Sequence, residues 1–312
     1  MRPIKEKSRL DEFSMNLPEN LPKTVIIGAS GFLGSHFLKA YRHVYPDCIG
    51  TALSPKGTNI FHLDLLNPNI TSLHLSETNH KKALIFAAIP KISKCETEKE
   101  LTWKVNVEGT LELIRELVAE GIKPIFFSSD YVFDGNTGNY SDNAPTNPIT
   151  EYGRQKAEVE AKIGEISKGN YLVVRLSKVF SIEKGDNSLL DEMACILASG
   201  SILRAAFDQI FCPTLISDLV NAVIKLQVCK TTGIVNVCSP EAWSRYDLAL
   251  EIAKAMEVNL DMICPNSLDE ICPEPKRPKN TSMKIERLLQ EIKYTFTPMS
   301  KCIEAVAKNW RK

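Results

Sequence analysis

The chain has 312 residues, of which 44% are hydrophobic and 24% charged, and its 38 Lys and Arg residues balance 38 Asp and Glu residues. It is long enough for a large buried core, and it lacks the basic excess typical of nucleic-acid binders. No apolar run approaches the roughly 18 residues of a membrane span, and the polar N-terminus lacks the apolar segment of a secretory signal. We therefore expect a cytoplasmic protein that binds neither nucleic acid nor membrane.

The polar leader and the cysteines give little sign of a special site. Residues 1–22, with Pro18 and Pro22 near their end, are interpreted as a flexible or loosely docked leader. Nine cysteines are scattered along the chain, and no two have the Cys-x-x-Cys spacing of a zinc site. Reduced thiols that pack as small hydrophobic side chains are the simplest interpretation, and we expect no metal site.

Strands and helices alternate after the leader. Apolar, β-branched runs predict strands at 23–27, 48–53, 82–88, 124–129 and 171–176. Apolar residues at helical spacing predict helices at 32–44, 99–120 and 153–166. This order is typical of an α/β fold, a Rossmann-type doubly wound parallel sheet with helices on both faces.

The pattern loosens after about residue 180. Helices are expected at 189–198, 216–228 and 246–256, a short strand at 234–237, and a proline-rich loop at 264–279. We interpret residues 23–180 as a dinucleotide-binding domain, to which segments around 205–240 return. Residues 181–312 are interpreted mainly as a smaller substrate lobe, placed over the carboxyl edge of the sheet, where ligands bind in open α/β sheets.

A glycine-rich turn, Gly28-Ala-Ser-Gly-Phe-Leu-Gly34, joins the first expected strand to the first expected helix. Its G-x-x-G-x-x-G spacing lets the backbone approach a pyrophosphate, and the helix N-terminus presents free N–H groups to that anion. The alternative is a tight turn that binds nothing. The turn predicts dinucleotide binding, with contacts from Gly28, Ser30, Gly31, Phe32, Leu33 and Gly34.

The end of the second expected strand bears on the choice of cofactor. An NAD-preferring site usually has a carboxylate there for the ribose 2′-hydroxyl, but this chain has Ser54 and Lys56. These side chains favour a 2′-phosphate, so NADP(H) is expected to be preferred over NAD(H), unless Lys56 is an ordinary surface lysine. Asp64 and Leu65 are expected to lie at the cofactor. Asp64 either accepts a hydrogen bond from the adenine amino group or caps a helix.

Tyr152-Gly-Arg-Gln-Lys156 places a phenol and an ammonium four residues apart, on one face of an expected helix. A nearby ammonium lowers the pKa of a phenol, whose ordinary value is about 10, and so aids proton exchange. Tyr152 is predicted to protonate a carbonyl oxygen as hydride reaches the carbon, and Lys156 to bond the nicotinamide ribose. Ser129, at a strand end, is predicted to hold the substrate oxygen. The alternatives are a surface helix pair and a strand-end cap.

These pieces together carry a family resemblance. The glycine turn, the string Phe127-Ser-Ser-Asp-Tyr-Val-Phe-Asp-Gly135 and the Tyr152 and Lys156 pair resemble extended short-chain dehydrogenases/reductases. Within these, the chain is similar to the dTDP-4-dehydrorhamnose reductase branch, which also contains the regulatory β subunit of methionine adenosyltransferase. Residues 103–110, 208–209, 213–214 and 277–280 are further similar pieces.

The resemblance implies a fold, an NADPH-type cofactor, a nucleotide-sugar 4-keto substrate and a triad of Ser129, Tyr152 and Lys156. It also implies neighbours for the cofactor and the substrate. Ala87, Ala88 and Asn106 would border the cofactor, Tyr131 and Phe133 would lie at the sugar end, and Arg277 would lie near the nucleotide diphosphate.

The chain also departs from the branch. Ile210-Phe211-Cys212 stands where a glycine is usual, so the sugar pocket need not be that of rhamnose. Reduction of a keto group on a nucleotide-linked sugar is the main functional hypothesis. The alternatives are a non-catalytic, dinucleotide-binding regulatory subunit and a nucleotide-sugar epimerase. Dehydration is disfavoured, because Asp130-Tyr131 replaces the Asp-Glu pair of dehydratases. A homodimer is compatible with the sequence, and the regulatory alternative would require a protein partner.

Overall fold

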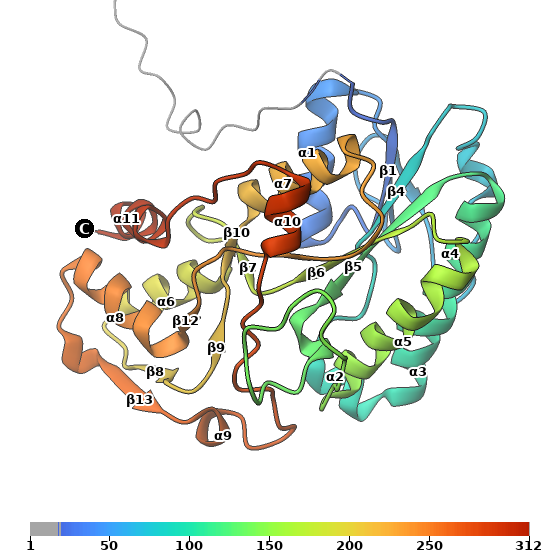
Figure 1. Ribbon diagram of the computed structural model, residues 1–312. Coiled ribbons are helices and arrows are strands. Elements are labelled where there is room, and N and C mark those ends of the chain that lie inside the picture. Colours follow the sequence, from blue (N-terminus) through green and yellow to red (C-terminus); the bar gives the residue numbers. More distant parts are fainter. Residues whose placement is uncertain (1–17, 19, 312) are drawn as a thin grey trace, which may run out of the picture.

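The computed structural model describes residue 18 and residues 20–311, which form an α/β fold around a seven-stranded parallel sheet (Figure 1). The strand order is β11-β6-β5-β4-β1-β2-β3. These strands are β1 Thr24–Ile27, β2 Gly50–Ala52, β3 Ile60–His62, β4 Lys82–Ile85, β5 Lys123–Ser129, β6 Leu172–Leu176 and β11 Gly233–Val237. The α/β fold class predicted from the sequence is confirmed.

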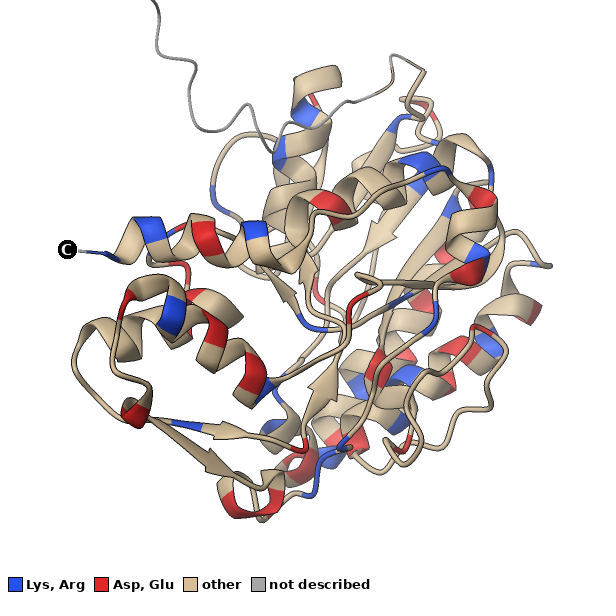
Figure 2. Cartoon of the chain, turned by 60° about the vertical axis from the view of Figure 1, so that its left-hand side comes forward, with Lys and Arg blue, Asp and Glu red and all other residues tan. Residues whose placement is uncertain are grey.

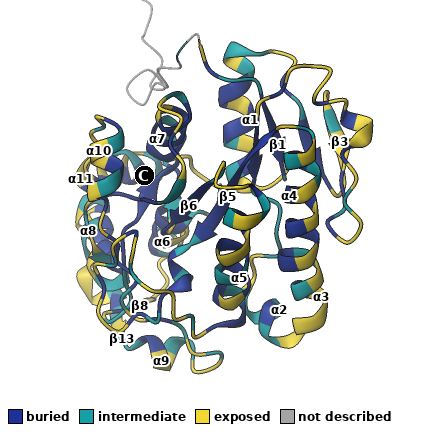
Figure 3. Cartoon of the chain, turned by 45° about the vertical axis from the view of Figure 1, so that its right-hand side comes forward, coloured by how far each residue is buried: buried dark blue, intermediate teal, exposed yellow. Residues whose placement is uncertain are grey.

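Both faces of the sheet are covered, because successive residues of a strand point to opposite sides. Ile26 packs with α1 (Phe32–Val44), α7 (Ile216–Val228) and α10 (Glu286–Glu291), whereas Ile27 packs with α4 (Thr110–Ala119) and α5 (Glu151–Ile166). Figure 3 shows the buried strands between helices whose outer faces are exposed. Because helices cover both faces of the sheet, a ligand can reach it at the ends of the strands.

The helix expected at 99–120 is interrupted. α2 (Ile92–Thr97) and α3 (Lys99–Trp103) precede a π-helical turn, η3 (Lys104–Gly109), which runs into α4. Gly109 lies against the carbonyl of Leu65 so closely that a Cβ atom would clash with it. The wider turn thus brings the helix backbone against the loop after β3, and π-helical turns of this kind often occur at functional sites.

A second hydrophobic cluster forms beside the sheet from α6 (Leu189–Ala198), α8 (Arg245–Met256) and α11 (Met299–Trp310). Phe211 is buried in this cluster. Three short strand pairs connect the cluster to the rest of the chain: β7 Val179–Phe180 with β10 Thr214–Leu215, β9 Ile210–Phe211 with β12 Trp243–Ser244, and β8 Leu203–Ala206 with β13 Ile263–Asn266.

The expectation of a loop over 264–279 was wrong in its first part. β13 includes Pro265, which is tolerated because the strand belongs to a two-stranded sheet and has a free edge. A short helix, α9 (Leu268–Ile271), follows it. Ser267 and Glu270 form a reciprocal capping box that starts this helix despite the nearby prolines.

The end of the N-terminal segment packs on the core, and charged residues are spread over the helices. Most of the expected leader lies outside the described residues, but Leu21 is buried in the core and its carbonyl accepts a hydrogen bond from Tyr45 Oη. Figure 2 shows basic and acidic positions interspersed over the described helices. In the described part of the chain, no helix has the length and apolar character needed to cross a membrane.

Candidate active site

A cavity of about 860 Å³ opens at the carboxyl ends of β1, β2, β4, β5 and β6. Most residues predicted for the cofactor and for catalysis line it, although they are far apart in sequence. They are Gly28, Ser30, Gly31, Phe32, Leu33, Gly34, Asp64, Leu65, Ala87, Ala88, Ser129, Tyr152 and Lys156. The predicted residues outside this lining are Ser54, Lys56, Asn106, Tyr131, Phe133 and Arg277.

The glycine turn requires glycine at its first position. Gly28 has φ +88°, and a Cβ atom there would lie 2.6 Å from the backbone nitrogen of Ala87. The N–H groups of Gly28 and Ala29 donate to the carbonyl of Thr51 at 3.0 and 2.7 Å, which fixes the turn against β2. No side chain caps the first turn of α1. Its free N–H groups therefore face the cavity edge and fit an anion such as a pyrophosphate.

Two buried hydroxyl groups in the cavity wall have no hydrogen-bond partner among the described residues. They are Thr51 Oγ1, at the end of β2, and Ser128 Oγ, on β5. Leaving a buried hydroxyl unpaired costs free energy, so the wall is suited to a polar ligand. The sequence analysis did not single out Thr51 as a residue of this cavity, although its place near the end of β2 was an available signal.

The loop after β2 and the loop after β3 form the end of the cavity that is away from Tyr152. Leu53 and Leu66 line it and are 63% and 52% exposed, so this end offers apolar surface to a ligand. Asp64 Oδ1 accepts a hydrogen bond of 2.9 Å from the N–H of Leu66 within a turn, so Asp64 caps no helix. Ser54 and Lys56 are exposed in the loop between β2 and β3.

The catalytic candidates meet at the other end of the cavity. Thr150 Oγ1 accepts from the N–H of Gly153 at 3.1 Å and starts α5, which places Tyr152 in its first turn. Lys156 is one turn further on, with its Nζ 5.8 Å from the centroid of the Tyr152 ring. The same Nζ donates to the carbonyl of Phe127 at 2.9 Å, so the ammonium is tied to the end of β5.

Burial dominates the proton chemistry of this pair. It raises the pKa of the Tyr152 phenol, and the charge of Asp130 adds to the effect, while a hydrogen bond with Ser129 opposes it. Burial also lowers the pKa of Lys156 to about 8. The expected lowering of the phenol pKa by Lys156 is therefore not seen in the protein by itself. A phenol that stays protonated at neutral pH can give a proton but is a poor base.

Two residues predicted from the family resemblance act behind the cavity wall. Asn106 Nδ2 donates to Gln155 Oε1 at 2.7 Å, and Asn106 Oδ1 accepts from the N–H of Ile89 at 2.7 Å. Asn106 therefore holds the segment after β4, which contains Ala87 and Ala88. Tyr131 stands beside Tyr152, with ring centroids 6.4 Å apart in an edge-to-face arrangement.

The expectation that Phe133 contacts the sugar needs correction. Its side chain is fully buried, stacks on the ring of Tyr140 at 4.2 Å and lies under the guanidinium of Arg175. The turn after β5 brings Tyr131 beside Tyr152 and places Phe133 in the core. Phe133 therefore supports the loop rather than the substrate.

Three cations gather where the second cluster meets the cavity. Lys178 lines the cavity, and its pKa is lowered by desolvation at the cavity wall and by the positive charges of Arg245 and Arg277. Arg277 Nε is buried and has no hydrogen-bond partner among the described residues. Among the described residues, none of the three forms an ion pair with an acidic side chain. The group is suited to an anionic ligand.

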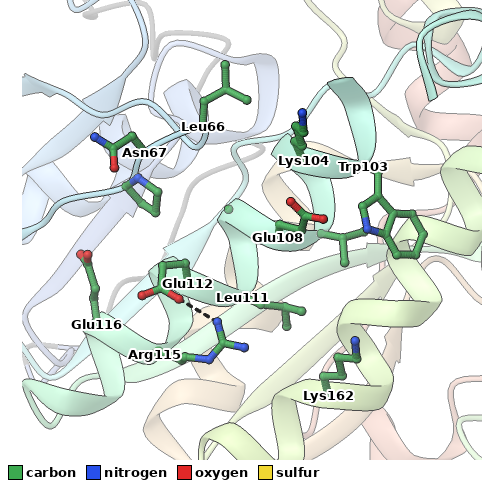
Figure 4. Close-up of a pocket in the computed structure, with 13 residues that line it drawn as sticks. Leu66, Asn67, Trp103, Lys104, Glu108, Leu111, Glu112, Arg115, Glu116 and Lys162 are labelled. Atoms are coloured by element: carbon green, nitrogen blue, oxygen red, sulfur yellow. Dashed lines mark hydrogen bonds and ion pairs between the residues drawn. The ribbon is translucent and has the colours of Figure 1, made fainter. Parts of the chain in front are cut away.

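Figure 4 shows a second hollow, of about 770 Å³, between the loop after β3 and η3 with α4. Lys104, Arg115 and Lys162 alternate there with acidic side chains, and Arg115 pairs with Glu112 at 2.7 Å. This lining is mixed in charge and contains none of the predicted site residues. Among the described residues, no group of His, Cys, Asp and Glu is arranged to hold a metal ion.

Similarity to known proteins identifies the family. Residues 22–311 match the family described as the RmlD substrate binding domain. The chain belongs to this family. Relatives include the probable low-salt glycan biosynthesis reductase Agl14 of Haloferax volcanii, 26% identical over 277 residues, which cover 86% of this chain and 91% of that protein. The bovine methionine adenosyltransferase 2 subunit beta is 24% identical over 292 residues, covering 90% and 85%.

Solved structures of family members have the same fold. A hypothetical dTDP-4-dehydrorhamnose reductase from Sulfolobus tokodaii is 26% identical with a TM-score of 0.77, over 90% of this chain and 98% of that one. The dTDP-4-dehydrorhamnose reductase of Bacillus anthracis, solved in complex with NADP, is 23% identical with a TM-score of 0.76, over 92% and 99%. The resemblance inferred from the sequence motifs is thereby confirmed.

Proposed function

We propose that this protein is an NADP(H)-dependent oxidoreductase that reduces a keto group on a nucleotide-linked sugar, in the manner of the dTDP-4-dehydrorhamnose reductases. One observation carries the proposal. A single cavity joins the glycine turn at one end to Tyr152, Lys156 and Ser129 at the other. A dinucleotide that lies along it would bring its reactive end to the proton donor.

The chain's own residues divide the chemistry between them. When bound, the nicotinamide supplies the hydride. Tyr152 gives its phenolic proton to the carbonyl oxygen of the sugar, and Ser129 holds that oxygen beside the phenol. Lys156, charged below its pKa of about 8, stabilises the phenolate that results and can bond the ribose. The raised pKa of Tyr152 favours this direction, because the donor begins each cycle protonated.

NADP(H) is the proposed cofactor for two reasons. The loop after β2 offers Ser54 and Lys56, and no carboxylate, to the 2′ position of the adenosine ribose. The Bacillus anthracis reductase was solved with NADP. Thr51 and Ser128, whose hydroxyl groups are buried and unpaired, are proposed as further polar contacts to the cofactor.

The proposed substrate end is cationic. Lys178, Arg245 and Arg277 suit the two phosphates of a nucleotide diphosphate, and Tyr131 suits the sugar beside Tyr152. Phe211 does not select the sugar, because its side chain is buried in the second cluster and does not line the cavity.

The direct test combines binding and turnover. Stabilisation by NADPH, NADH and a panel of nucleotide sugars is followed by thermal unfolding over a range of ligand concentrations. Ligands that stabilise the protein are then tested for turnover, followed as loss of the reduced nicotinamide absorbance. NADPH consumption with a 4-keto nucleotide sugar supports the proposal. Interconversion of sugars without net NADPH consumption would instead identify an epimerase.

A regulatory role is the second candidate, because the bovine methionine adenosyltransferase β subunit is similar to this chain over 90% of its length, at 24% identity. Such a subunit would bind the dinucleotide and act through a partner. Purification from its source with a stoichiometric synthetase, together with no turnover of any keto sugar, would favour this role over the reductase.

A further inference from the structure

Arg277 stands in a loop whose own backbone does little to fix it. We call residues 273–278 the Arg277 loop. Three of them, Pro273, Pro275 and Pro278, have no N–H group to donate. Among the described residues, no residue of this loop forms a backbone–backbone hydrogen bond. The position of the loop therefore depends on the residues at its two ends.

The guanidinium of Arg277 lies near the proposed substrate end. Its Nε is buried and has no hydrogen-bond partner among the described residues. Burial raises the pKa of the Tyr131 phenol, and the charges of Arg277 and Arg245 are among the effects that oppose this rise. Arg277 is therefore a neighbour of Tyr131, which stands beside Tyr152. A charged side chain binds a ligand best when the loop that carries it is already ordered.

Lys279, at the end of the Arg277 loop, pairs with two carboxylates. Its Nζ lies 2.9 Å from Asp208 Oδ2 and 2.8 Å from Asp269 Oδ2. The bonds to Asp269 and Asp208 raise the pKa of the Lys279 ammonium, so it stays charged at neutral pH. Asp208 belongs to the turn between β8 and β9, and Asp269 belongs to α9. Lys279 therefore ties the loop to two separate elements beside the sheet.

The attachment at Asp208 is fixed from both sides. Asp208 Oδ1 accepts from the N–H of Leu268, the first residue of α9, at 2.6 Å. The backbone of Lys279 is held to the same turn, because its carbonyl accepts from the N–H of Ile210 at 2.6 Å. The ammonium of Lys279 thus meets a carboxylate whose own orientation is set by the chain.

The chain beyond Lys279 is anchored without the ion pairs. The N–H of Asn280 donates to the carbonyl of Gly135 at 2.9 Å. Thr281 Oγ1 donates to the buried carboxylate of Asp130 at 2.7 Å. Loss of the ion pairs should therefore loosen the Arg277 loop and leave the segment after it in place.

We propose that Lys279 is a positioning residue for the binding of a nucleoside diphosphate: its two ion pairs hold the Arg277 loop so that the guanidinium of Arg277 meets the phosphates. This inference rests on the function proposed above, in which Arg277 faces the diphosphate of a nucleotide sugar. Lys279 acts through Arg277, because its own charge is already neutralised by two carboxylates. It should change the affinity for the ligand and leave proton transfer at Tyr152 as it is.

The experiment measures binding and turnover in a double-mutant cycle. The Kd for dTDP and for UDP is measured by calorimetric titration, and KM and kcat with the keto sugar that the wild type reduces. Because exposed ion pairs contribute modestly, Lys279→Met should raise the Kd for dTDP and the KM roughly three- to tenfold. Both kcat and the Kd for NADPH should stay within about twofold. In an Arg277→Ala background, Lys279→Met should change the Kd for dTDP by less than about twofold.

Three further variants separate positioning from other effects. Lys279→Arg keeps a cation for both carboxylates and should retain most of the affinity. Asp208→Asn removes one ion pair from the opposite side, and its remaining oxygen can still accept from the N–H of Leu268. It should weaken dTDP binding as Lys279→Met does. Lys284→Met is the control, since Lys284 is a 51% exposed lysine of the same segment, 3.9 Å from Glu286, and should leave the Kd unchanged.

Several results would overturn the inference. Wild-type affinity for dTDP in Lys279→Met and Asp208→Asn would show that the ion pairs position nothing. An equal loss from Lys279→Met with and without Arg277 would show an effect of charge alone. If Lys279→Met did not fold, Asp208→Asn would decide the question.

The inference and the proposed function can fail separately. If the wild type bound neither dTDP nor UDP, the assignment of a diphosphate to Arg277 would fall and the role of Lys279 with it. If dTDP bound and its affinity depended on Lys279 through Arg277, but no nucleotide sugar were reduced, the inference would hold and the reductase function would fall.

Discussion

The ammonium nitrogen of Lys156 lies 5.8 Å from the centroid of the Tyr152 ring, one helical turn away and at the same end of the cavity. The two groups are close enough for the charge of Lys156 to favour the phenolate once the proton has left. Burial works against that charge, because it raises the pKa of Tyr152 and lowers that of Lys156. Tyr152 therefore starts each cycle protonated, beside an ammonium group that is charged only below about pH 8.

Removal of the phenolic oxygen should separate binding from chemistry. Tyr152→Phe should bind NADPH as the wild type does but lose roughly 100- to 10,000-fold in kcat, the usual contribution of a positioned proton donor. Calorimetric titration and steady-state kinetics measure the two effects. Tyr171→Phe, just before β6, is the control and should change neither. Wild-type turnover by Tyr152→Phe would exclude this residue as the donor.

The buried charge of Lys156 should lower the free energy of unfolding at neutral pH. Because its folded pKa is about 8 and its ordinary value 10.5, burying the ammonium costs on the order of 3 kcal/mol at low pH, less the hydrogen bond to Phe127. A depressed folded pKa means that stability is lost as pH falls from 10.5 through 8. Lys156→Met should therefore raise Tm at neutral pH, and its advantage should shrink toward pH 10.5.

Lys162→Met, on the exposed face of the same helix, is the control for this measurement. It should change Tm little at either pH. A Lys156→Met variant that is less stable than the wild type at neutral pH would show that the ammonium is stabilised in the fold.

The cofactor preference can be tested at the loop after β2. Lys56→Ala should weaken NADPH binding roughly tenfold and leave NADH binding unchanged, because only NADPH carries the 2′-phosphate. Lys81→Ala, an exposed lysine just before β4, serves as the control. Equal loss of affinity for both cofactors, or a wild type that prefers NADH, would contradict the NADP(H) assignment.

The buried ion pair behind the site should dominate stability. Arg175 Nη2 lies 2.7 Å from Glu160 Oε2, and both side chains are 3% exposed. Glu160→Gln leaves the guanidinium underneutralised and should lower the free energy of unfolding by about 3 kcal/mol. Glu112→Gln, in the exposed pair with Arg115, should cost less than about 1 kcal/mol. Denaturant unfolding of both variants measures the difference, and similar losses would argue against a special role for the buried pair.

Local patterns in the sequence predicted much of this site. The four-residue spacing of Tyr152 and Lys156 places both side chains on one face of a helix. The glycine spacing between a strand and a helix predicts the turn that starts α1. The positions that failed depend on tertiary packing. Whether Phe133 faces the core or the cavity is set by the turn after β5. The bond between Asp130 and Thr281 joins residues 151 positions apart, which no local pattern encodes. The π-helical turn at 104–109 reflects contact with Leu65 and not a helix propensity.

The most direct test of the proposed function is the consumption of NADPH by the purified protein with a dTDP-4-dehydro-6-deoxy sugar. We expect stoichiometric loss of NADPH with formation of the hydroxyl sugar by the wild type, and no measurable loss by Tyr152→Phe at equal NADPH saturation. Tight NADPH binding by both proteins, with no consumption by either across the panel of 4-keto nucleotide sugars, would contradict the proposed function.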